Sequence, residues 1–130
     1  MTFSPPCSKH LELPIVYKDQ SLVVVDKPSG LLSIPGRLPQ LKDSVAMRIE
    51  QRFPNATGPL IAHRLDMDTS GLMVLGLTPA TQRALSMQFE ARQVRKTYVA
   101  QVAGELRADQ GTIELPFRLD VDNRPHQIHD

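Results

Sequence analysis

Nine mostly polar residues, 63–71 (HRLDMDTSG), separate two apolar runs, 60–62 (LIA) and 72–77 (LMVLGL). Short apolar runs bounded by turn residues predict buried strands, so the polar residues between them are expected to form a turn. Two functions are compatible with such a turn. It can open a calcium-binding loop, or it can hold a single catalytic carboxylate.

The calcium hypothesis fails within the sequence. Asp66, Asp68 and Ser70, followed by Gly71, have the spacing that opens an EF-hand loop. The twelfth position of that loop needs a bidentate glutamate, and here it is Leu77. The loop also needs a helix on each side, whereas a strand is predicted after this turn.

Other metal and cofactor sites have little support. Cys7 is the only cysteine, which leaves neither a disulfide framework nor a cysteine-based zinc site. The histidines show no ligand spacing apart from a weak pair near the end of the chain. The glycines lack the spacing of a nucleotide-binding loop. We therefore expect a protein that uses neither a metal nor a cofactor.

A carboxylate in a polar turn is what remains. Asp66 follows Arg64 by two positions, and a carboxylate beside a cation stays ionised at neutral pH and can act as a nucleophile or a base. The alternative is structural. Asp66 and Thr69 would tie down the turn through side-chain hydrogen bonds, and Asp68 would be a solvated charge. The residues alone leave both interpretations open.

The remaining pattern predicts an α+β domain with a mainly antiparallel mixed sheet and flanking helices. One helix is expected to begin at Asp43 or Ser44 and to end at Pro54, and another has Thr78 as its N-cap. One side of this second helix is expected to carry Ala84, Leu85, Phe89 and Arg92. The predicted strands are residues 15–17, 22–25, 72–77, 97–103 and 111–115.

Charge is distributed unevenly although the net charge is only +1. Residues 35–64 and residues 91–107 each carry a local charge of +3, and residues 108–130 carry −3. Two basic segments on either side of the central turn can form a phosphate-binding face, and scattered solvated charge is the alternative. The first residues hold no apolar segment long enough for a signal peptide, and no window approaches a membrane span. We therefore expect a cytoplasmic protein without a membrane partner.

Three stretches resemble one enzyme family. Residues 63–75 (HRLDMDTSGLMVL) resemble the signature of the RluA-type pseudouridine synthases, in which His-Arg-Leu-Asp precedes a hydroxyl pair, a glycine and an apolar strand. Residues 24–32 (VVDKPSGLL) are similar to the family's N-terminal "NKPSGL" segment, and residues 95–100 (RKTYVA) to its "K-x-Y-x-A" strand. The three matches occur in the family's order.

The resemblance implies an RNA-modifying isomerase that converts uridine to pseudouridine in rRNA, tRNA or both, without a cofactor or a metal. Asp66 matches the essential carboxylate, which acts either as a nucleophile at the sugar or as a base. Arg64 is expected to enter the RNA stack, and a salt bridge to Asp66 or Asp68 is its alternative role. Tyr98 is expected to be a second catalytic residue that packs on the target uracil and assists proton transfer, and an ordinary core tyrosine is its alternative role.

Further residues receive supporting roles from the same resemblance. His63 is expected to orient the turn, and Lys27, with Pro28 and Gly30, is expected to shape a loop near the site. The basic side chains become candidate RNA contacts, which would make binding depend on salt. Besides Arg64, these candidates are Arg37 and Lys96, followed by Lys42, Arg92 and Arg95.

The chain also departs from the family pattern. Family catalytic domains are longer and carry a later Gly-Arg-(Thr/Ser)-His-Gln-Leu-Arg motif, which residues 124–128 (RPHQI) resemble only superficially. We therefore expect residues 1–14 to be an irregular lead-in and residues 15–130 to be the N-terminal portion of a catalytic domain, with a sheet incomplete at its C-terminal end. A monomer with weak or no activity is expected. The alternative function is a truncated, non-catalytic remnant that binds RNA weakly or needs a partner to complete its sheet.

Overall fold

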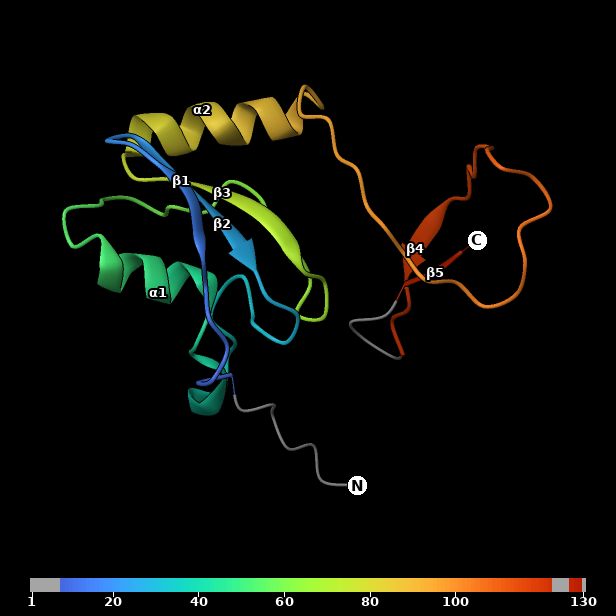
Figure 1. Cartoon of the computed structure of the whole chain (residues 1–130), viewed down its shortest axis with the longest axis horizontal. Helices are drawn as coiled ribbons and strands as arrows, with labels where there is room; N and C mark the ends of the chain where they lie inside the picture. Colours follow the sequence, from blue (N-terminus) through green and yellow to red (C-terminus); the bar gives the residue numbers. More distant parts are fainter. Residues whose placement is uncertain (1–7, 123–126, 130) are drawn as a thin grey trace. The chain divides into compact units, whose positions relative to one another are not determined.

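The computed structural model describes residues 8–122 and 127–129, and the chain divides into two units, Met1–Lys96 and Thr97–Asp130 (Figure 1). The first unit contains most of the regular structure. Its elements are β1 (Ile15–Lys18), β2 (Leu22–Lys27), η1 (Pro39–Leu41), α1 (Val45–Arg52), β3 (Gly71–Gly76) and α2 (Pro79–Glu90). The second unit contains an antiparallel pair, β4 (Phe117–Leu119) and β5 (Gln127–His129).

A three-stranded antiparallel sheet in the order β1–β2–β3 forms the centre of the first unit. β2 pairs with β3 along its whole length, from Leu22 opposite Gly76 to Lys27 opposite Gly71. β1 joins β2 through a tight turn in which the Asp19 carboxylate accepts hydrogen bonds from the backbone nitrogens of Ser21 and Leu22. The register places the last residue of β2 beside the first residue of β3, so the turn after β2 lies next to the polar run that precedes β3.

Alternation along β2 and β3 creates the hydrophobic core. Val23 and Val25 of β2 and Met73 and Leu75 of β3 are buried, because successive side chains of a strand point to opposite faces. Val45 and Ile49 of α1 belong to the same core cluster. Figure 1 shows α1 and α2 on opposite sides of the sheet, and within α2 every side chain keeps some exposure. The predicted α+β class is confirmed.

Both helices begin where the sequence predicts. Ser44 Oγ accepts a hydrogen bond from Met47 N (3.1 Å) at the start of α1, and Thr78 Oγ1 accepts one from Thr81 N (3.2 Å) at the start of α2. The end of the second helix differs from the prediction. α2 ends at Glu90, and Arg92 has a positive φ of 55°, so Arg92 does not lie on the helix face with Phe89.

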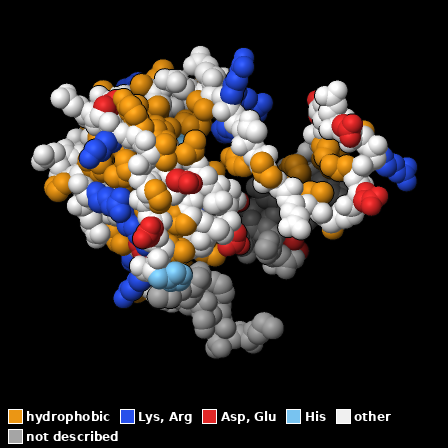
Figure 2. Space-filling model, viewed as in Figure 1, with side chains coloured by type: hydrophobic (Ala, Val, Ile, Leu, Met, Phe, Trp, Pro, Cys, Tyr) orange, Lys and Arg blue, Asp and Glu red, His pale blue; other side chains and the backbone are white. Residues whose placement is uncertain are grey.

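Two predicted strands are wrong. Residues 97–103 and residues 111–115 have no strand structure, and the strand of this region is β4. Their β-branched residues suit a strand, but a strand forms only where a neighbouring strand pairs with its backbone groups. The side chains of Val99 and Ile113 are largely exposed, in keeping with the apolar surface that Figure 2 shows on the second unit.

Residues 8–14, which precede β1, are irregular and are attached to α1 by hydrogen bonds. Leu13 is buried in the core, and Arg52 Nη1 donates a hydrogen bond to its backbone oxygen (2.9 Å). Arg48 forms a salt bridge with Asp43 (2.7 Å) and also donates hydrogen bonds to backbone oxygens of this segment. Across the described residues, no helix is long and apolar enough to cross a membrane.

An alanine at position 76 should destabilise the first unit. A Cβ built on Gly76 would lie 2.4 Å from the backbone nitrogen of Gln82, so the backbone of α2 itself would have to move. We expect Gly76→Ala to lower stability by about 2 kcal/mol, which lowers the melting temperature by roughly 10 °C for a unit of this size. Thermal denaturation followed by circular dichroism measures this effect. Gly111→Ala is the control because its Cβ would meet nothing within 4 Å, and equal melting temperatures for the two variants would contradict the prediction.

Candidate active site

The polar run between the two apolar segments forms a loop that is held through its main chain. The backbone oxygen of Met67 accepts a hydrogen bond from Gly30 N (2.8 Å), and that of Asp68 accepts one from Ser29 Oγ (2.8 Å). Ser33 Oγ donates to the backbone oxygen of Leu65 (2.5 Å) and accepts from its nitrogen (3.0 Å). The turn after β2 thus fixes this loop, which we call the Asp66 loop (residues 64–70).

Lys27 lies beneath the Asp66 loop with its side chain fully buried. Its ammonium group donates three hydrogen bonds, to the backbone oxygens of Pro28 (3.0 Å), Leu31 (2.7 Å) and Met67 (2.9 Å). These bonds use all the donors of an ammonium group. Burial lowers the pKa of Lys27, while the negative charges of Asp68 and Asp66 act in the opposite direction. The expectation that Lys27 shapes a loop near the site is confirmed.

The carboxylate of Asp66 is exposed on the outer side of this loop. Its backbone oxygen accepts a hydrogen bond from Thr69 N (3.1 Å), so the turn is closed by the main chain and not by the carboxylate. Within residues 8–122, the carboxylate receives neither a hydrogen bond nor a salt bridge. The structural alternative, in which the side chain ties down the turn, therefore does not describe this loop.

Arg64 is also exposed, and in the described part of the chain it makes no salt bridge with Asp66 or Asp68. The alternative role as an ion-pair partner is therefore not realised in this structure. The guanidinium and the Asp66 carboxylate are separated by one residue, Leu65, whose side chain is buried in the core. Burial of Leu65 leaves the two charged neighbours on the surface.

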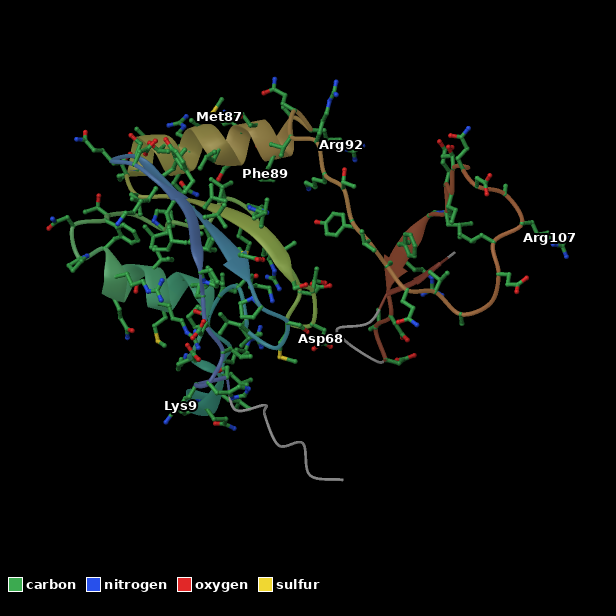
Figure 3. All side chains as sticks on the ribbon, viewed as in Figure 1. Lys9, Asp68, Met87, Phe89, Arg92 and Arg107 are labelled. Carbon is green, nitrogen blue, oxygen red and sulfur yellow. The ribbon has the colours of Figure 1, made fainter. Side chains whose placement is uncertain are left out.

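His63, which precedes the loop, contacts two elements. Its Nε2 accepts a hydrogen bond from Val74 N of β3 (3.1 Å), and its ring stacks on Phe89 of α2 with centroids 4.1 Å apart and an interplanar angle of 15°. Phe89 lies on the side of α2 that faces the sheet (Figure 3). Burial lowers the pKa of His63, and the nearby charge of Lys96 lowers it further.

The other candidate RNA contacts are distributed over the first unit. Arg37 is exposed, whereas Lys42 donates a hydrogen bond to the backbone oxygen of Gly36 (3.0 Å) and so helps to close its own loop. Beyond α2, Arg92, Arg95 and Lys96 are exposed, and Lys96 Nζ lies 5.3 Å from the centroid of Phe89. Since Arg48 and Arg52 bind the protein itself, part of the basic charge in residues 35–64 is structural.

Tyr98 belongs to the second unit and lies in an irregular segment with 61% of its surface exposed. An ordinary core tyrosine would be buried, so that alternative role does not fit this structure. The stretch 124–128 lies mostly outside the described residues. Among the described residues, no group of three or more His, Cys, Asp or Glu side chains could hold a metal ion.

Two supporting residues were missed in the sequence, Ser33 and the Phe89 partner of His63. Ser33 is 4% exposed and interrupts an apolar stretch, 31–34 (LLSI), which is the one signal that could have marked it. A hydroxyl in an apolar run needs a hydrogen-bond partner when it is buried. Phe89 was predicted only as part of an apolar helix face, and its stacking on a histidine left no sequence signal.

Comparison with known proteins gives a consistent result. Residues 21–129 match the family model described as RNA pseudouridylate synthase. A dual-specificity RNA pseudouridine synthase RluA from Yersinia pestis is 50% identical over 113 residues, 87% of this chain and 53% of that protein. The protein of the same name from Haemophilus influenzae is 45% identical over 125 residues, 96% of this chain and 55% of that protein.

A solved structure titled Human RNA Pseudouridylate Synthase Domain Containing 4 aligns with 61% of this chain and 30% of that chain, with 31% identity and a TM-score of 0.48. The dual-specificity RluA of Escherichia coli K12 is 49% identical over 115 residues, 88% of this chain and 51% of that protein. The chain spans about half the length of the curated relatives it matches.

Proposed function

The chain belongs to the family of RNA pseudouridylate synthases, and from this premise we propose that it isomerises uridine to pseudouridine in RNA, with Asp66 as the essential carboxylate. The observation that supports Asp66 most is its surroundings. The Asp66 carboxylate has no hydrogen-bond or salt-bridge partner within residues 8–122. Its loop is held by five hydrogen bonds to main-chain oxygens, and the donors are Gly30, Ser29, Ser33, Lys27 and Thr69. A fixed loop with a free carboxylate is what positioning of a reactive group requires.

The proposed reaction breaks the bond between C1′ of the ribose and N1 of uracil and forms a bond between C1′ and C5. The proton leaves C5 for a base and solvent, and N1 gains one, so no net oxidation occurs and no cofactor is required. Asp66 acts either as the nucleophile that attacks the sugar or as a base that removes a proton from it. An ionised carboxylate beside an electron-poor sugar follows the logic of glycoside hydrolysis.

RNA is the proposed partner, as the name of the relatives, dual-specificity RNA pseudouridine synthase, supports. The proposed substrates are rRNA, tRNA or both, as the resemblance in the sequence implies. The exposed cations Arg64, Arg37 and Lys96 would contact phosphates or the base stack. Tyr98 would pack on the target uracil. Residues 15–130 would form the N-terminal portion of the catalytic domain. A cytoplasmic location and a monomeric state stay predictions.

A second function has one observation in its favour. The second unit exposes several large apolar side chains, and a two-stranded β4–β5 pair is by itself marginally stable. Such a unit suits the alternative function, a non-catalytic chain that binds RNA weakly or needs a partner to complete its sheet. Among the exposed side chains are Val99, Leu106, Ile113 and Phe117.

Tritium release from C5-labelled uridine in rRNA and tRNA separates the two functions. Isomerisation replaces the C5 hydrogen, so release into solvent by the folded chain supports the synthase. Filter binding to the same RNAs is measured in parallel. Binding without release supports the non-catalytic alternative, and the absence of both from folded protein refutes the proposed function.

A further inference from the structure

The outer edge of β3 is covered by the segment that leads into the Asp66 loop. Gly76 N donates a hydrogen bond to the backbone oxygen of Leu60 (2.9 Å), and Ile61 forms an antiparallel bridge with Leu75. The next outward-pointing amide, Val74 N, donates to Nε2 of His63. An imidazole nitrogen therefore takes the place of the backbone carbonyl that would continue the ladder.

The same segment is held from its other side by α2. Gln82 Nε2 donates a hydrogen bond to the backbone oxygen of Ile61 (2.8 Å), and the His63 ring stacks on Phe89. Among the described residues, the bond from Val74 N to His63 is the last hydrogen bond between this segment and β3 before the chain continues to Arg64 and Asp66. The far end of the loop is anchored separately, by the turn after β2.

We propose that His63 is a positioning residue whose neutral imidazole fixes the start of the Asp66 loop to the edge of β3, and that protonation of this imidazole releases it. The fixed loop is established by geometry, and only its importance for catalysis rests on the proposed function. Nε2 can accept from Val74 N only while it carries no proton, so the proton of the neutral ring is on Nδ1. In the imidazolium form Nε2–H would face Val74 N–H, and two donors would oppose each other.

Burial and one nearby cation both disfavour the charged form of His63. β3 has no ionisable side chain, and the ionisable side chains of α2, Arg83 and Glu90, are exposed. Within its own segment the neighbouring charge is Arg64, and the segment after α2 contributes Lys96, whose charge lowers the pKa of His63 in addition to burial. A positive charge on the imidazole beside Lys96 is therefore unfavourable.

The sign of the pH dependence follows. The pKa of His63 lies below its ordinary value of 6.5 in the folded state, so between the two values the unfolded chain binds more protons. The stabilisation that His63 provides is complete above pH 6.5 and is lost as the pH falls through the folded value. The start of the Asp66 loop should loosen over that range.

Amide hydrogen exchange of the whole chain, followed by NMR, tests this proposal with an internal reference. Val74 N depends on His63, whereas Gly76 N donates to Leu60 on the same edge of the same strand. After correction for intrinsic exchange, protection of Val74 relative to Gly76 should fall, by up to about tenfold per pH unit, as the pH drops from 6.5 to the His63 midpoint, and should level off below it. The amide signals of Arg64 and Asp66 should shift with the same midpoint.

Two variants sharpen the test. His63→Gln keeps an acceptor but cannot titrate, so the ratio of Val74 to Gly76 protection should become independent of pH. Lys96→Met removes the nearby cation and should raise the His63 midpoint. An unchanged ratio across the wild-type titration, fixed Asp66 signals, or the same pH dependence in His63→Gln would overturn the proposal. Because these readouts need no RNA, they stand apart from the tritium assay, whose failure would count only against the proposed function.

Discussion

Asp66→Asn should reduce tritium release from C5-labelled RNA by at least about a thousandfold, the scale at which loss of a single essential catalytic group is felt. The amide has nearly the shape of the carboxylate but carries no charge and is neither a nucleophile nor a base at neutral pH. Within residues 8–122 the carboxylate makes no hydrogen bond or salt bridge that the substitution would remove. The melting temperature should therefore stay within about 2 °C of the wild type, since surface substitutions of this kind change stability little.

Asp68→Asn is the matched control for this prediction. Asp68 lies on the same loop, is exposed, and contacts Ser29 only through its backbone oxygen. We expect it to retain activity within a few fold, because its side chain is not assigned a role in the reaction. Equal losses in both variants would show that general charge on the loop matters, and a fully active Asp66→Asn variant would refute the assignment of Asp66.

Lys27→Met should destabilise the first unit by about 3 kcal/mol, which corresponds to a melting temperature lowered by more than about 10 °C. Replacing a buried charged pair by apolar residues can be neutral, but here the partners are three backbone oxygens that cannot be replaced. Methionine fills much of the same volume and supplies no donor. We expect the largest part of the lost stability to come from the backbone oxygen of Leu31, which forms the shortest of the three bonds (2.7 Å) and would be left buried without a donor.

Urea denaturation measures the loss for Lys27→Met, with Lys18→Met as the control. Lys18 ends the edge strand β1 and is exposed, so its replacement should change stability by less than about 0.5 kcal/mol. Lys27→Met should also destabilise the Asp66 loop, because it removes the hydrogen bond from Lys27 to the backbone oxygen of Met67. If the two variants unfolded at the same urea concentration, the buried ammonium would not be a structural support.

Local signals in the sequence predicted much of the first unit. The apolar run after HRLDMDTSG, the Ser44 and Thr78 caps and the turn after β2 are determined by nearby residues, and the structure confirms them. The run before the motif, residues 60–62, forms only an isolated bridge between Ile61 and Leu75 and is not a strand. The predicted strand at residues 97–103 failed because strand formation depends on a distant neighbour. A composition that suits a strand says nothing about whether that neighbour is present.

The residues that support the Asp66 loop were harder to predict than the position of the loop in the chain. Lysine is among the residues least often buried, so nothing in the sequence marked Lys27 as part of the interior. The salt bridge considered between Arg64 and Asp66 was a natural expectation for charges two positions apart, but Leu65 inserts into the core between them. These side-chain positions depend on the contacts between the turn after β2 and the Asp66 loop, and the sequence of neither segment alone predicts those contacts.

The Asp66 loop is fastened through the main-chain oxygens of Leu65, Asp66, Met67 and Asp68. Every amino acid supplies the same carbonyl group, so this fastening is indifferent to the side chains at positions 67 and 68. Substitutions at those two positions leave these main-chain oxygens in place, although the charge of Asp68 also acts on the buried Lys27. If Asp66 is the reactive group, as proposed, preferences for an RNA surface could change at positions 67 and 68 while the hydrogen bonds that hold its loop stay the same.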